Sequence, residues 1–285
     1  MNAINVKKTH NPFKKIPWWG WVGAIIFIIF QIGLYKLACF FAMQIKDAFP
    51  NYPICPKIDP LDNGIKFCPY FFIEIYFLAY GFWFITPLWI STTRNKQNFL
   101  NFMIYSTIAS FVGFFWLIAM PTYMDRVAEG LITPEGGAGP LVQNIKTPVT
   151  KFLVQLIIAM DTGTTGWNLC PSYHCMASAL CFFAVLKQKE HKKATQIGFG
   201  IMALLVCMAT VLVKQHYFVD ILGGVGVATI PYLITVLAWK PGQRIMINNP
   251  LFLQTKKLTK RDVEKAEDAN ETTTKEKKEK LVEKK

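Results

Sequence analysis

Residues 195–239 read TQIGFGIMALLVCMATVLVKQHYFVDILGGVGVATIPYLITVLAW. Two apolar runs, about 195–214 and 217–239, meet at a short polar segment, 214–220, that contains His216 and Asp220. Each run is close to the ~20 residues that a helix needs to cross ~30 Å of hydrocarbon. Backbone polar groups cannot stay unpaired in lipid, so each run is expected to be a helix. This stretch therefore predicts a helical membrane hairpin with ionisable residues at its turn.

The rest of the chain repeats this pattern of apolar runs separated by short polar segments. Of its 285 residues, 52% are hydrophobic and 14% are aromatic. Runs of similar length give six spans with these approximate bounds: 19–43, 70–92, 99–120, 170–187, 195–214 and 217–239. The stretch 141–160 is interrupted by Lys146, Pro148 and Lys151 but keeps apolar residues at helical spacing, which is typical of an amphipathic interfacial helix. The sequence thus predicts an all-α fold, a six-span transmembrane helical bundle with an outer interfacial helix.

The positive charge is placed along the chain as membrane topology requires, not on a nucleic-acid-binding face. The net charge is +13, and most of the basic residues precede the first span, follow the last one, or lie in the short loops near 92–99 and 187–195. By the positive-inside rule these segments face the cytoplasm, and both termini are expected there. We expect residues 1–18 to be a cytoplasmic segment, 19–240 the membrane domain, and 241–285, rich in Lys and Glu, a disordered tail.

The polar segment 214–220 has the residue types of a nucleophilic site. His216 and Asp220 are four residues apart, so on one helix they would face the same side. A carboxylate there can hold the imidazole in one tautomer and leave its other nitrogen as a nucleophile or base. Lys214 adds positive charge that would attract an anionic substrate. The structural alternative is a pair that only caps and solvates the span, but ionisable groups near hydrocarbon are costly, which favours function.

A second polar segment, about 40 residues earlier, is expected at the same membrane depth. Pro171 is expected to begin the helix, with Ser172, Tyr173 and His174 in its first turn. Free backbone N–H groups and the positive end of the helix suit a phosphate group. His174 could then protonate a leaving oxygen. The structural alternative is an interfacial histidine beside an aromatic ring, which the pairing with the first segment disfavours.

These motifs resemble those of a known family. Pro171-Ser172-x-His174 followed by His216-x3-Asp220 is similar to the second and third motifs of the type 2 phosphatidic acid phosphatase superfamily. The resemblance covers about residues 70–240 and is nearest to the branch that includes inositol phosphorylceramide synthases. It implies a membrane lipid phosphatase or phosphotransferase, with a membrane lipid as substrate and the bilayer as its surroundings. Nucleic acid is not an expected partner, and no cofactor is implied.

The chain departs from the family pattern at several motif positions. Arg126 matches the arginine of the first motif, but Val127 replaces the following proline and Ala119 the upstream lysine. In the second motif Tyr173 replaces a glycine, and in the third the pair Ala209-Thr210 replaces serine and arginine. Lys214 is the expected partial substitute for the missing cations.

The resemblance assigns roles to the matching residues. His216 would attack phosphorus and form a phosphohistidine, Asp220 would orient it, and His174 would protonate the departing oxygen. The phosphoryl oxygens would be held by these residues: Arg126, Lys214, Ser172 and Tyr173. No metal is implied, because the sequence offers no carboxylate cluster to hold magnesium.

Several alternatives stay open from the sequence. The chain could be a catalytically weak relative that binds lipid phosphates, or, less in keeping with its span pattern, a small transporter. An active enzyme could transfer the phosphoryl group to water or to an alcohol. In the first outer loop, Cys55 and Cys68 could form a disulfide in an oxidising compartment or remain two free thiols.

Overall fold

A computed structural model describes most of the predicted membrane domain. The described residues are 16–49, 51, 57–93, 95–160, 165–167, 170–186, 188–189 and 191–237. Residues 1–235 form one compact unit and residues 236–285 a second. The predicted tail 241–285 and Cys55 lie outside the described residues, as does nearly all of the segment 1–18.

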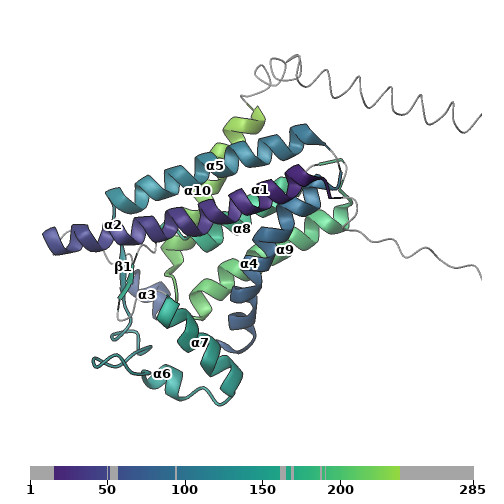
Figure 1. Cartoon of the computed structure of the whole chain (residues 1–285). Coiled ribbons are helices and arrows are strands. Elements are labelled where there is room, and N and C mark those ends of the chain that lie inside the picture. The colour runs from purple at the N-terminus through teal and green to yellow at the C-terminus, as the bar shows by residue number, and fades with distance from the viewer. Residues whose placement is uncertain are drawn as a thin grey trace, which may run out of the picture. The chain divides into compact units, whose positions relative to one another are not determined.

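The described chain is mainly helical, as predicted. The elements in chain order are α1 (Trp18–Ile29), the π-helical turn η2 (Phe30–Leu34), α2 (Tyr35–Ala48), α3 (Asp59–Asp62), α4 (Tyr70–Ser91), α5 (Lys96–Ala119), β1 (Tyr123–Asp125), α6 (Pro140–Gln143), α7 (Pro148–Met160), β2 (Thr165–Trp167), α8 (Tyr173–Val185), α9 (Lys193–Leu212) and α10 (Phe218–Leu237). Strands β1 and β2 pair antiparallel, with Met124 opposite Gly166. Figure 1 shows α3, α6, α7 and β1 beyond one end of the long helices, away from the start of α1.

Five helices are long and apolar enough to cross a membrane, and the chain is a multi-pass membrane protein. Their bounds are Trp18–Ile45, Tyr70–Ser91, Lys96–Ala119, Lys193–Leu212 and Phe218–Val236. The fourth predicted span, 170–187, is shorter than expected because α8 has only 13 residues, or about 20 Å of helix. The full six-span count is therefore not reproduced. Most of α8 is buried against α4, α5 and α9. Because other helices cover α8, it does not need the length of a helix that faces lipid.

The predicted interfacial helix 141–160 is present as two helices, α6 and α7. A break at residues 144–147 separates them, and Pro148 begins α7, where its missing N–H costs no helical hydrogen bond. Helix α7 packs against α4. Its Val149 and Phe152 side chains are exposed, whereas Val154 and Ile157 are buried, so the helix is amphipathic as predicted.

Contacts between the helix ends show that α1 and α5 begin at the end of the bundle where α4 and α8 end. At the end where α1 begins, the rings of Trp19 and Phe99 lie with centroids 4.6 Å apart. A Cβ at Gly20 would clash with Ser91, the last residue of α4. The Asn98 side chain near the start of α5 donates to the carbonyl oxygen of Ala184 near the end of α8, at 3.5 Å.

The opposite end brings together both polar segments identified in the sequence. The Ser172 N–H donates to the carbonyl oxygen of Asp220 at 3.0 Å. Helix α10 approaches α8 closely here because it has glycine at two successive positions. A Cβ at Gly223 would lie 2.9 Å from the sulfur of Cys170, and one at Gly224 would clash with the Ser172 carbonyl oxygen. This close approach sets the spacing of the candidate site.

Candidate active site

His216 lies in the turn between α9 and α10, and a helix-ending motif fixes that turn. The N–H of Lys214 donates to the carbonyl oxygen of Val211 at 3.1 Å, and the N–H of Gln215 to that of Thr210 at 2.9 Å. This is the Schellman pattern, which needs a left-handed residue after the helix. Lys214 takes that position with φ of 54°, although glycine is the usual residue there. His216, two residues after Lys214, is thereby held at the end of the bundle.

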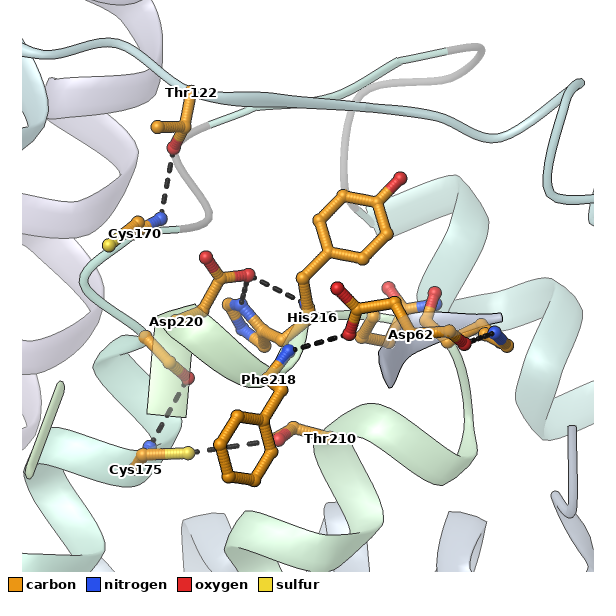
Figure 2. Close-up of polar contacts among 12 residues, drawn as sticks. Asp62, Thr122, Cys170, Cys175, Thr210, His216, Phe218 and Asp220 are labelled. Atoms are coloured by element: carbon orange, nitrogen blue, oxygen red, sulfur yellow. Dashed lines mark hydrogen bonds and ion pairs between the residues drawn. The ribbon is translucent and has the colours of Figure 1, made fainter. Parts of the chain in front are cut away.

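His216 and Asp220 form the expected pair, but not on one helix. Helix α10 begins at Phe218, so His216 lies in the turn before it and Asp220 in its first turn. His216 Nδ1 lies 3.3 Å from Asp220 Oδ2, and the same oxygen accepts the Tyr217 N–H at 2.8 Å. Figure 2 shows His216 between Asp220 and Asp62. With Nδ1 at the carboxylate, Nε2 is the ring nitrogen on the side away from Asp220.

His174 lies in the first turn of α8, inside a group of aromatic side chains from α4. Its ring stacks on Tyr76 with centroids 4.3 Å apart and lies 5.2 Å from the ring of Trp83. Its Nε2 atom is 3.3 Å from the Tyr80 hydroxyl. The Trp83 indole N–H is held by the Ser178 hydroxyl at 3.0 Å. These contacts fix the direction of the imidazole.

The two imidazoles lie close to each other. The ring centroids of His174 and His216 are 6.0 Å apart, which lets one phosphoryl group contact both rings. A pocket with a cavity volume of about 90 Å³ extends from His174 between η2, α2, α4 and α7. The site therefore combines an imidazole paired with a carboxylate, a second imidazole and a cavity beside that second imidazole.

The first turn of α8 has an N-cap residue and backbone N–H groups, as expected of a helix end that binds an anion. Ser172 is the N-cap, and its hydroxyl oxygen accepts the Cys175 N–H at 3.3 Å. The first intrahelical bond runs from the Met176 N–H to the Ser172 carbonyl oxygen, so the N–H groups of Tyr173 and His174 have no acceptor within the helix. The Tyr173 side chain points elsewhere, because its hydroxyl donates to the Ser110 carbonyl oxygen on α5 at 2.7 Å. Any contact of Tyr173 with a phosphate would therefore use its backbone N–H.

Arg126 is fully buried beside the turn that carries His216. One guanidinium nitrogen donates to the side-chain oxygen of Gln215 at 3.1 Å and another to the carbonyl oxygen of Ile158 at 3.2 Å. Arg126 follows β1 directly. The arginine of the first motif is thus held next to the third motif, even though Val127 replaces the proline.

Lys214 belongs to an ionic network that sequence reasoning missed. Its ammonium group donates to the Asp62 carbonyl oxygen at 3.1 Å and lies 3.5 Å from Glu129 Oε2. Glu129 also pairs with Lys57 at 2.7 Å and accepts from the Tyr217 hydroxyl at 3.3 Å. The buried carboxylate of Asp62 accepts the Phe218 N–H at 2.9 Å and so caps α10. Asp62 and Glu129 come from two separate segments between the long helices, and no local motif marks them.

Because Lys214 has an unusual backbone conformation, two substitutions can separate its backbone from its charge. Both Lys214→Gly and Lys214→Ala remove the ammonium group, but only glycine adopts a positive φ without strain. We expect Lys214→Ala to unfold at the lower temperature, by an amount equivalent to about 1 kcal/mol. Thermal unfolding of both variants in one detergent measures this. Equal midpoints would mean that the turn is not held as described.

The charge on Glu129 couples the network to pH. Burial alone would raise the pKa of the Glu129 carboxyl, but the hydrogen bond and charge of Lys57, the charge of Lys214 and the Tyr217 hydroxyl hold that pKa below its ordinary value of 4.5. A carboxyl whose pKa is lowered by folding stabilises the protein above its unfolded pKa and loses this effect as pH falls through the folded pKa.

Glu129→Gln should therefore destabilise the protein most at neutral pH. We expect a loss of about 1–2 kcal/mol near pH 7, because Lys57 and Lys214 lose a charged acceptor. Well below the ordinary pKa of the carboxyl, wild type and variant should approach each other in stability. Unfolding midpoints of both proteins across that pH range check this. A difference independent of pH would show that the Glu129 charge does not hold the network.

The fold and the site define a helical multi-pass membrane protein with a His/His/Asp arrangement at one end of its bundle. The family model of the PAP2 superfamily matches residues 68–234, which is more than half of the chain, and the chain belongs to this superfamily. The resemblance found from the motifs is thereby confirmed at the level of the superfamily. The matched range contains Arg126, His174, His216 and Asp220. Comparison with curated proteins and with solved structures gave no match.

Proposed function

We propose that the protein is an integral membrane phosphatase or phosphotransferase that acts on a phospholipid or polyprenyl phosphate through a phosphohistidine. The observation that supports this best is the position of two imidazoles with centroids 6.0 Å apart, one of them paired with Asp220. Membership of the PAP2 superfamily and the membrane-spanning helices agree with it.

The reaction needs two proton transfers and one covalent intermediate. His216 Nε2 attacks phosphorus, a P–N bond forms, and the P–O bond to the lipid breaks as His174 gives its proton to the leaving oxygen. Asp220 stabilises the positive charge that develops on His216. In the second half, water or an alcohol attacks the phosphohistidine while His174 takes the proton back. His216 is then released, and the phosphoryl group leaves as phosphate or as a new ester.

Negative charge on the phosphoryl oxygens would be held by groups at the same end of the bundle. Arg126 supplies a buried cation beside Gln215, and the α8 N-terminus supplies the N–H groups of Tyr173 and His174 together with the Ser172 hydroxyl. Lys214 adds positive charge from the turn, although it is shared with Glu129. Such preorganised donors act strongly where water is excluded.

The direct test is phosphate release from a panel of phospholipid and polyprenyl phosphates by the purified protein. The proposal predicts release that persists in excess EDTA, because the steps above use only side chains of this chain. Release that depends on added magnesium would contradict this mechanism. Tight binding of the same lipids without any release or transfer would favour the alternative of a catalytically inactive lipid-phosphate-binding relative.

We further propose that the active site faces away from the cytoplasm, with both termini on the cytoplasmic side. The basic loop segments lie at the end opposite His174 and His216, as the positive-inside rule requires. Single cysteines at Gly137 and Gln188, in a cysteine-free background, test this on intact cells with a membrane-impermeant thiol reagent. Labelling at 137 and protection at 188 are expected. The reverse pattern would overturn the orientation.

A further inference from the structure

The pocket beside His174 contains a polar side chain that the mechanism does not use. The pocket is lined mainly by aromatic and aliphatic groups from α4, α7 and α8, and its polar members include Gln31 and Lys36. Lys36 lies at its edge and donates to the carbonyl oxygen of Met160, the last residue of α7, at 2.6 Å. Gln31 is 2% exposed and comes from the π-helical turn η2. Such turns inside a helix are frequent at functional sites.

Hydrogen bonds on α5 fix the orientation of the Gln31 amide. The Ser110 hydroxyl donates its one hydrogen to the Ser106 carbonyl oxygen at 2.7 Å, so towards Gln31 it can only accept. The Gln31 amide nitrogen donates to that hydroxyl at 2.7 Å. The nitrogen therefore faces α5, and the amide oxygen is the end of the group that Ser110 does not hold.

That amide oxygen is a buried acceptor with no hydrogen-bond donor among the described residues. Of the side chains that line the pocket, Gln31 alone has such an atom in the described part of the chain. A buried polar atom left unpaired destabilises the folded state, so most are satisfied by protein, water or ligand. An apolar pocket with one oriented acceptor suits a ligand that is apolar apart from one hydrogen-bond donor.

We infer that this pocket holds the alcohol part of the phosphoryl substrate, and that Gln31 selects an alcohol with a free hydroxyl close to the ester oxygen. The inference rests on the proposed function, since it takes the pocket that opens from His174 as the place of the leaving group. The aromatic rings of Tyr76, Tyr80 and Trp83 pack against the carbon chain, and the hydroxyl of the ligand donates to the Gln31 amide oxygen. Gln31 is a specificity-determining residue and takes no part in bond breaking.

A matched pair of substrates tests this selectivity. One is a monoacyl glycerol phosphate with a free hydroxyl on its central carbon, and the other is the same ester with hydrogen in place of that hydroxyl. In the wild type the hydroxylated ester should have the higher kcat/KM, by roughly threefold to tenfold for one neutral hydrogen bond. In Gln31→Met, which keeps the length of the side chain but loses the acceptor, the ratio should fall to about one. The ratio does not depend on how much of the variant is folded.

Gln44→Met is the matched control, because Gln44 is exposed on α2 outside the pocket, and it should keep the wild-type ratio. A wild-type ratio of one, or an unchanged ratio in Gln31→Met, would overturn the inference while phosphate release still supported the proposed function. Release from neither ester nor any other phosphate in the panel would overturn the proposed function itself, and this inference with it.

Discussion

His216→Ala is expected to lower turnover of any lipid phosphate substrate by roughly 10⁴-fold or more, because removing a covalent nucleophile leaves only residual binding effects. Expression and membrane insertion should be unchanged, since His216 lies in a turn and its ring holds no helix cap. Turnover is measured as phosphate or ester formed per protein in detergent.

His191→Ala provides the matched control for this substitution. His191 is an imidazole in the segment between α8 and α9, next to the start of α9 and at the opposite end of the bundle. Its replacement should leave turnover within a small factor of wild type. Near wild-type turnover in His216→Ala would show that His216 is not the nucleophile.

His174→Ala should have an effect that depends on the leaving group. With an alkyl phosphate, whose alkoxide leaves poorly without a proton, we expect a loss of roughly 10²–10⁴-fold, the usual size of general acid catalysis. With a nitrophenyl phosphate ester, whose phenolate leaves without protonation, the loss in the bond-breaking step should be far smaller. His216→Ala should lose activity on both substrates alike.

Comparing the two esters distinguishes the role of His174 from that of His216, which a loss of activity on one ester cannot do. The bond-breaking step is isolated by following the burst of nitrophenolate in the first turnover. An equal loss on both esters in His174→Ala would mean that His174 positions or binds the substrate and is not the acid.

Local pattern alone was enough to predict the membrane spans and the family motifs. The apolar runs near 70–92, 99–120 and 195–214 correspond to α4, α5 and α9 within a few residues. Helix α8 is shorter than the predicted span 170–187, because hydropathy measures apolar content and not whether lipid or protein covers it. Helix α8 is short and buried among other helices, a property of the assembled bundle.

The partners of the site residues depend on contacts distant in sequence and could not be predicted. Asp62 caps α10 by accepting from Phe218, which is 156 residues away in the sequence. Glu129 accepts from Tyr217, which is 88 residues away in the sequence. Gln31 appeared only as one polar residue in an apolar run, and its burial depends on Ser110 of α5. A signal for the close packing of α8 and α10 was present in Gly223-Gly224, next to Asp220, but glycine pairs also occur in loops and bulges.

The most direct test of a phosphohistidine on His216 is to trap it. Protein is mixed with a lipid phosphate that is radiolabelled in the phosphoryl group, and the reaction is quenched within one turnover. The protein should then carry label that is stable to alkali and released by acid, because a phosphorus–nitrogen bond has these properties. The label should be absent from His216→Ala and present in Gln44→Met. Label that remains in His216→Ala, or turnover in the wild type without any acid-labile phosphoprotein, would contradict the account.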